Sequence, residues 1–238
     1  MLVITTRHVQ RSATHTRASN MPHELHGEHR AEGQIRPKAH GNYYEGTVFI
    51  MASNVHFTSR DLVRIAMFAA LLSVFSFIRI PVGPVPITLQ TLAVMLAGLI
   101  LGPVNGMLSV LLMLALTFVG IPLLGGNGGP AIFVGVSAGY LYGWILGALV
   151  IGLIAHQGHR LVWWKSALAS LVGGVLIPYA IGFPVQALVM GAPLKGVIIS
   201  GMIFVPGDIA KVVIATLIAT ALMRAYPAAF PESLRASK

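Results

Sequence analysis

Residues 204–215 read FVPGDIAKVVIA, a stretch that places an aspartate and a lysine inside an apolar segment. Asp208 and Lys211 are the only charged residues between Lys195 and Arg224. Ionisable residues inside a membrane segment are rare, and they usually face the interior of the bundle, where they serve function. The stretch therefore raises two questions: where the helix begins, and what the two charges bind.

The composition identifies an integral membrane protein. Hydrophobic residues make up 55% of the 238 residues and charged residues 10%, against roughly 25% charged in a soluble domain. At a mean hydropathy of +0.79, a soluble fold would lack the charges to cover its apolar surface. The basic residues form no stripe interleaved with aromatics, which argues against nucleic-acid binding. The sequence has no cysteine, so disulfides, thiolate metal sites and cysteine nucleophiles are excluded.

Residues 1–58 are predicted to be a disordered polar extension. Residues 1–50 hold six Lys or Arg, four Glu and six His and show no sustained apolar period. The loosely spaced His23, His26 and His29 are interpreted as part of a solvated tail, so no metal site is expected. MASNVHFTSRDLVRIAMF, from Met51, is typical of the start of a membrane protein. We hypothesise that translation begins at Met51, and N-terminal mass spectrometry that finds residues 1–50 in the mature chain would refute this.

Residues 59–226 are predicted to form an all-α membrane domain of six transmembrane helices, followed by a short cytoplasmic tail at 227–238. The apolar runs are close to the length of about 17–25 residues that spans a bilayer. The expected spans are 62–80, 87–101, 107–121, 137–155, 163–187 and a last one that ends at 224.

The distribution of basic residues predicts the orientation in the cytoplasmic (plasma) membrane. Six spans place both termini on one side, and only Arg79 and Lys195 then fall on the other side. By the positive-inside rule the termini are cytoplasmic, and loops 81–86, 125–136 and 188–206 face outward. The basic residues on the cytoplasmic side are Arg60, Arg64, Arg160, Lys165, Arg224, Arg235 and Lys238.

Pro206 predicts the start of the sixth helix. Proline favours the first turn of a helix, and it pushes Val205 before it away from helical angles. Residues 188–204 would then be a short interfacial or re-entrant piece. Asp208 would lie in the first turn, near the outer side, with Lys211 on the same face. The alternative is a local ion pair or helix cap, with the lysine reaching outward.

Other short patterns have both a structural and a functional interpretation. GGNGGP at 125–130 lets the backbone around Asn127 approach a ligand closely, or it is simply a flexible turn. Ala66 and Ala70 form a small-xxx-small pair that allows close helix packing, although alanine is abundant in this chain. The membrane part has no Ser-His-Asp set, HExxH motif or carboxylate pair, so an enzyme is not expected.

Together these stretches resemble the BioY family, the biotin-specific substrate-binding (S) components of energy-coupling factor (ECF) transporters. The resemblance covers about residues 60–224. It is carried by GPVPITLQTLAVMLAG (83–98), GGNGGP (125–130), AGYLYGW (138–144) and VPGDIAKVV (205–213). One departure is SAGY at 137–140, where the family usually reads closer to TGGY, and this leaves the detailed role of Tyr140 open.

The resemblance implies an S-component bundle with an outward-facing vitamin pocket and no cofactor. It implies as partners a transmembrane coupling subunit, which Ala66 and Ala70 would dock, and two cytoplasmic ATPases. Asn127, Asp208 and Lys211 match positions associated with the biotin head group. We hypothesise that Asp208 accepts the ureido N–H groups and that Lys211 and Asn127 donate to its carbonyl, unless Lys211 binds biotin's carboxylate.

Further assignments remain open on the sequence alone. Tyr140 is expected beside the apolar part of biotin. The PVGPVP loop, with Thr88 and Gln90, is either a lid over the pocket or a rigid connector. Alternative functions are an S component for another vitamin, a channel, a stand-alone proton-coupled carrier with Asp208 as its proton site, or a structural membrane protein.

Overall fold

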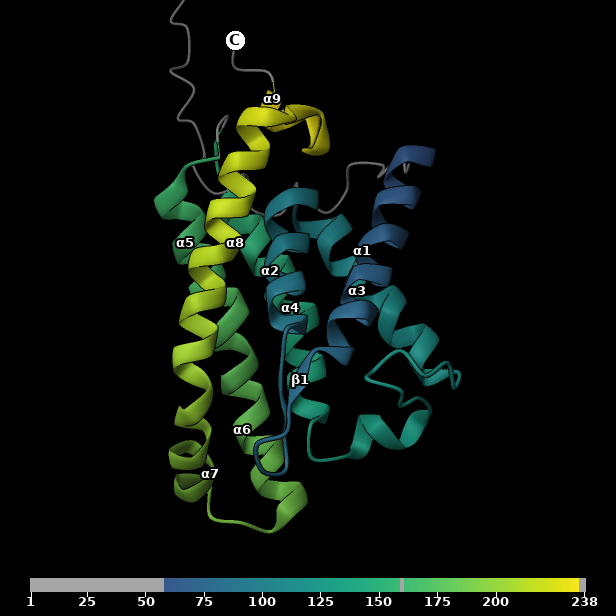
Figure 1. Ribbon diagram of the computed structural model, residues 1–238, viewed down its shortest axis with the longest axis vertical. Helices are drawn as coiled ribbons and strands as arrows, with labels where there is room; N and C mark the ends of the chain where they lie inside the picture. Colours follow the sequence, from purple (N-terminus) through teal and green to yellow (C-terminus); the bar gives the residue numbers. More distant parts are fainter. Residues whose placement is uncertain (1–57, 159–160, 236–238) are drawn as a thin grey trace, which may run out of the picture. The chain divides into compact units, whose positions relative to one another are not determined.

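The computed structural model describes residues 58–158 and 161–235, and the helices form a bundle (Figure 1). The N-terminal extension, the Met51 start and the three tail histidines lie outside the described residues. The helices are α1 Ser59–Phe77, α2 Gln90–Leu101, α3 Pro103–Phe118, α4 Ala138–Ala155, α5 Trp163–Leu171, α6 Ile177–Met190, α7 Leu194–Gly201, α8 Val205–Ala225 and α9 Glu232–Arg235.

Three helical runs of the described chain are long and apolar enough to cross a membrane: Ala138–Ala155, Trp163–Met190 and Leu194–Ala225. They correspond to the fourth, fifth and sixth expected spans. The helices α2 and α3 are apolar but have only 12 and 16 residues, so at about 1.5 Å per residue α2 reaches roughly 18 Å. A helical membrane protein is therefore confirmed, whereas the count of six spans stays a prediction.

Helix α4 lies at the centre of the bundle and packs closely on α6. Three glycines of α4, each four residues after the last, face α6 and the turn before it: Gly139, Gly143 and Gly147. A Cβ atom at Gly139 would lie 2.7 Å from the Ile181 carbonyl oxygen and 2.9 Å from the Gly182 Cα. Only residues without a side chain allow the two backbones to approach this closely.

A wide π-helical turn, Val172–Leu176, joins α5 to α6 without ending the helix. Proline at 178 has no N–H to donate to the carbonyl four residues earlier, which would leave a break in an ordinary α-helix. Within this turn the Ile177 N–H donates to the Val172 carbonyl, five residues earlier, as in a π-helix. The helix continues past Pro178 to Met190, and Tyr179 faces the cavity inside the bundle.

The last long helix, α8, begins at Val205, next to the predicted start at Pro206, and Asp208 lies in its first turn as expected. The expectation that Val205 avoids helical angles is wrong, and the helical run does not begin at this point. Helix α7 begins at Leu194, a 3-10 turn covers Met202–Phe204, and α8 follows directly, with helical angles at Val205 (φ −56°, ψ −48°). Pro206 cannot donate to the Met202 carbonyl, and the Val205 N–H donates to it instead. The tight turn thus pairs the carbonyl that the proline would orphan, and the helical run continues from α7 into α8. The interfacial or re-entrant placement of residues 188–204 stays a prediction.

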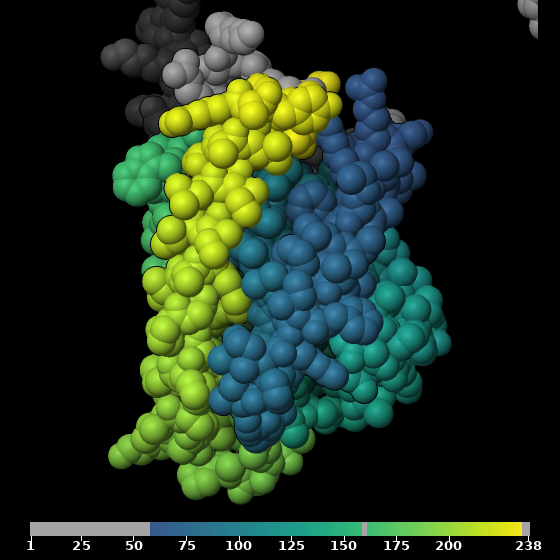
Figure 2. All heavy atoms as spheres, viewed as in Figure 1, coloured from purple at the N-terminus to yellow at the C-terminus, as the bar shows by residue number. Residues whose placement is uncertain are grey.

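The segment between α1 and α2 is a small antiparallel hairpin, which the sequence analysis did not predict. Strand β1 (Arg79–Ile80) pairs with β2 (Ile87–Thr88), with Arg79 opposite Thr88. The loop 81–86 turns at Gly83, whose φ of +69° favours glycine. Figure 2 shows the side chains of this hairpin segment next to those of α7 and α8 on one face of the molecule.

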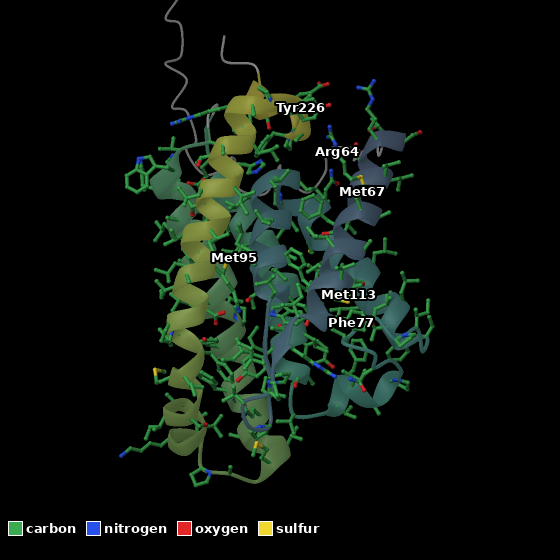
Figure 3. The ribbon with its side chains drawn as sticks, viewed as in Figure 1. Arg64, Met67, Phe77, Met95, Met113 and Tyr226 are labelled. Atoms are coloured by element: carbon green, nitrogen blue, oxygen red, sulfur yellow. The ribbon has the colours of Figure 1, made fainter. Side chains whose placement is uncertain are left out.

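The C-terminal segment folds back on the bundle beyond α8. Phe230 is 0% exposed and Leu234 is 5% exposed, and both belong to the main apolar core. Figure 3 shows Arg64 reaching from α1 toward this segment, and its Nη2 donates to the Ala228 carbonyl at 2.6 Å. Residues 227–235 therefore cover the end of the helices and tie it to α1.

Candidate functional site

The described residues enclose a cavity of about 290 Å³. Its walls come from α1, α2, α4, α6 and α8, and the β1–β2 hairpin and the 124–132 loop complete them. This volume is near the lower limit of small-molecule pockets, which hold about 300–1,000 Å³. All of the ligand-contact and lid residues predicted from the sequence line it: Thr88, Gln90, Asn127, Tyr140, Asp208 and Lys211.

Asp208 and Lys211 form a buried ion pair at one wall of this cavity. The Lys211 Nζ lies 2.9 Å from the Asp208 Oδ1, and the two residues are 7% and 4% exposed. They are three residues apart, so they lie on the same face of α8. Asp208 is in the first turn of α8, but α7 precedes that turn without a break, so no free helix end stabilises the carboxylate.

Two further side chains complete the polar cluster around Asp208, each from a different helix. The Tyr179 hydroxyl of α6 donates to the Asp208 Oδ2 at 2.6 Å. The Thr91 Oγ1 of α2 accepts from the Lys211 Nζ at 2.9 Å and donates to the Asp208 Oδ1 at 3.3 Å. The carboxylate is therefore held from three helices, which satisfies much of its hydrogen-bonding capacity inside the bundle.

Tyr140 belongs to a second, less polar wall. Its hydroxyl donates to the Gln186 Oε1 at 2.7 Å, and its ring meets the Phe183 ring edge-on with centroids 6.2 Å apart. A Cβ at Gly182 would clash with the Tyr140 ring, so the absence of a side chain there lets the ring lie flat against α6. Tyr140 can thus offer a ligand an apolar ring face while its hydroxyl is already paired.

Two buried donors at the cavity have no hydrogen-bond partner among the described residues. They are the Gln90 Nε2 and the Trp144 Nε1, on side chains that are 3% and 7% exposed. A buried donor without an acceptor costs about 1–3 kcal/mol. A ligand that brings acceptor atoms to this wall would remove that cost, so the site favours an acceptor-bearing ligand.

The remaining predicted residues take places that the sequence left open. Asn127 is exposed, and its Nδ2 donates to the Leu124 carbonyl at 3.2 Å within its own tight turn. Thr88 lies in β2, whereas Gln90 is the first residue of α2, so only Thr88 belongs to the hairpin over the cavity. Ala66 and Ala70 are exposed on α1, away from the cavity.

The sequence analysis did not identify four of the polar residues that line the cavity: Arg79, Thr91, Trp144 and Tyr179. Thr91 and Trp144 lie inside motifs that were quoted for the family, but no role was given to them. Tyr179 follows a proline in the middle of an apolar run, where a hydroxyl is a usable signal. Arg79 was considered only as a charge on the outward side.

Comparisons with known proteins assign the chain to a family. The BioY family profile matches residues 51–228. The biotin transporter BioY of Rhizobium etli is 42% identical over 180 residues, covering 71% of this chain and 96% of that protein. That of Rhodobacter capsulatus is 42% identical over 183 residues, with the same shares covered.

A solved structure supports the same assignment at the level of the fold. The crystal structure of the S-component for biotin from an ECF-type ABC transporter matches with a TM-score of 0.67 and 33% identity, covering 71% of this chain and 95% of that chain. Both the sequence and the arrangement of helices are therefore shared over 71% of this chain and along nearly the whole length of its relatives. The chain is a member of the BioY family.

Proposed function

We propose that this protein binds biotin and takes it up across the membrane as the substrate-specificity subunit of an ECF-type transporter. The observation that carries the proposal is the buried Asp208–Lys211 pair at the wall of a small cavity. Family members with matching sequence and fold are biotin transporters and a biotin S-component. The role is transport, and ATP hydrolysis would belong to partner subunits.

The polar cluster supports a specific placement of the ureido ring. The Asp208 carboxylate can accept about four hydrogen bonds, and the three N–H groups of the Lys211 ammonium can each donate one. Lys211, Thr91 and Tyr179 already donate to Asp208, and Lys211 donates to Asp208 and Thr91. One acceptor site on the Asp208 Oδ2 and one N–H of Lys211 therefore remain within the same cluster. A cyclic urea presents an N–H next to a carbonyl, which matches that pair.

The rest of biotin finds suitable surfaces in the same cavity. The thiophane ring and the start of the valeryl chain would lie against the Tyr140 ring. The unpaired donors of Gln90 and Trp144 would receive acceptor atoms of the ligand. In this arrangement Asn127 shapes the 124–127 turn at the rim, and its contact with the carbonyl is secondary. Thr88, in the hairpin, would form part of a lid.

The proposal includes the assembly and its orientation. A transmembrane coupling subunit and two cytoplasmic ATPases would drive transport, with the exposed Ala66 and Ala70 on α1 as the docking surface. Six helices would cross the cytoplasmic membrane with both termini inside. The hairpin, which completes the cavity at the end of α1 opposite Ser59, would then face outward.

Binding of biotin to the purified protein tests the proposal. We expect wild type to bind biotin, and Asp208→Ala to lose at least about a hundredfold in affinity, since a few kcal/mol of charge-assisted contacts disappear. Tyr142→Phe is a matched control, because the Tyr142 hydroxyl bonds to Phe133 outside the cavity. An Asp208→Ala protein with normal affinity would refute the site.

Uptake assays separate the remaining functions. In reconstituted vesicles, biotin uptake that requires ATP and the partner subunits supports the proposal. Uptake driven by a proton gradient without partners would indicate a stand-alone carrier. Displacement of biotin by thiamine or riboflavin at similar concentration would instead indicate an S component with another vitamin as its substrate.

A further inference from the structure

The proposed function, on which this inference rests, leaves one end of the ligand without a partner. Biotin carries a carboxylate at the end of its valeryl chain, and a carboxylate in a membrane protein needs a compensating charge. Lys211 is not free to supply it, because its Nζ lies 2.9 Å from both the Asp208 Oδ1 and the Thr91 Oγ1. A second cation at another part of the cavity would supply this charge.

Arg79 is the other basic residue among the described residues that line the cavity. It is exposed, at the start of β1, and within 58–158 and 161–235 its guanidinium makes no ion pair or hydrogen bond. Asp208, Lys211 and Arg79 together give the lining one uncompensated positive charge. A monoanionic ligand neutralises this excess.

The backbone next to Arg79 is shaped to make room for its side chain. A Cβ atom at Gly125 would lie 2.9 Å from the Arg79 Nη1 and 3.4 Å from its Cζ, so the guanidinium lies directly on the Gly125 backbone. Gly125 also has φ +57°, which favours glycine. The Arg79 guanidinium thus lies between the hairpin and the 124–127 turn, where loops rather than helices form the wall of the cavity.

We propose that Arg79 binds the carboxylate of the ligand, while Asp208 and Lys211 bind its ring. A guanidinium presents two parallel N–H donors that match both oxygens of a carboxylate. Its exposed position at the loops keeps the desolvation cost low for a charged group that enters last. The arrangement also gives Lys211 one role only, at the ring.

Paired affinities for biotin and biotinamide test this assignment, because the amide lacks the negative charge. In wild type, biotin should bind more tightly than biotinamide. In Arg79→Gln, biotin affinity should fall about tenfold or more, whereas biotinamide affinity should change less than twofold. Arg79→Lys keeps the positive charge but loses the two parallel N–H donors. Its affinity for biotin should lie between those of wild type and Arg79→Gln. Lys195→Gln, an exposed change on α7 outside the cavity, should alter neither affinity.

Each other outcome overturns a different claim. Equal losses for both ligands in Arg79→Gln, or no loss for biotin, would overturn the carboxylate role while leaving biotin binding intact. Selective loss of biotin over biotinamide in Lys211→Gln would transfer that role to Lys211. A wild-type protein that binds neither ligand would overturn the proposed function and this inference with it. A thermal unfolding curve for each variant verifies that it is folded.

Discussion

At the scale of single residues, the Asp208–Lys211 pair is costly to build and more costly to break. Removing two charges from water costs free energy, and this cost is offset only when the charges pair with each other and make further hydrogen bonds. Tyr179 and Thr91 provide these bonds to Asp208. The pair therefore depends on all of its partners, and removal of one charge leaves the other buried and alone.

We expect Lys211→Met to destabilise the protein by about 3–5 kcal/mol, because Asp208 then remains as an uncompensated buried charge. The double variant Asp208→Leu with Lys211→Met should recover much of this loss, since no charge is left. Thermal unfolding in detergent measures both. Additive losses in the double variant would contradict the interpretation of the pair as a coupled unit.

His156 makes the stability of the protein dependent on pH. It follows the last residue of α4, outside the span, and its Nε2 donates to the Leu99 carbonyl at 2.9 Å. Burial lowers the pKa of His156 below its ordinary value of 6.5, although the bond to Leu99 opposes the shift. The unfolded chain then binds the proton first as the pH falls, so this contribution is complete above pH 6.5 and is lost below it.

We therefore expect the melting temperature of wild type to fall more steeply between pH 7.5 and 5.5 than that of His156→Gln. The other histidines are the same in both proteins, so their contributions cancel in the comparison. Thermal unfolding at a series of pH values measures the difference. Parallel curves for the two proteins would show that His156 does not contribute.

At the scale of secondary-structure elements, glycine spacing decides how α4 and α6 pack. Gly139→Ala would place a Cβ 2.7 Å from both the Ile181 oxygen and the Val185 Cβ. We expect a loss of about 1–3 kcal/mol by overpacking. Gly196→Ala in α7 is the control, because no atom lies within 4 Å of its added Cβ, and it should be neutral or stabilising by up to about 1 kcal/mol. Similar unfolding temperatures for the two variants would contradict this packing argument.

The elements also show what the sequence could predict. Apolar run length located α4, the α5–α6 run and the end of α8, because these depend on composition alone. The start of α8 next to Pro206 was predicted, but its continuity with α7 was not, because the 3-10 turn that pairs the Met202 carbonyl leaves no signal in the sequence. The strand residues 79–80 and 87–88 were placed in the expected spans 62–80 and 87–101, which is wrong, since two-residue strands leave no periodic pattern.

The candidate site was predictable in part for similar reasons. Asp208 and Lys211 stand out as charges in an apolar run, and the cavity places Asn127 and Tyr140 with them. Tyr179 and Thr91 were not predicted as partners, because their role depends on how α6 and α2 approach α8. Arg79 was seen only as a flanking charge, because its place in the cavity depends on the hairpin.

At the scale of the whole molecule, the C-terminal segment acts as a cover on one end of the bundle. Phe230 is 0% exposed and packs with the main core, and Arg64 bonds to the neighbouring Ala228. We expect Phe230→Ala to reduce stability by about 3–5 kcal/mol through the cavity it leaves. The exposed Tyr226→Ala should have a much smaller effect. Thermal unfolding of the two variants measures these losses of stability. Equal losses would show that the C-terminal segment contributes little to stability.

Two irregular turns interrupt the two longest helical runs near the cavity. The π turn precedes Pro178, and the 3-10 turn includes Phe204 and precedes Pro206, while Pro178 and Phe204 both line the cavity. A helix bends most easily where its regular ladder of hydrogen bonds is broken. Both long helical runs therefore bend most easily next to the cavity. Bending at these two turns would change the shape of the cavity, while the close-packed remainder of each helical run stays straight.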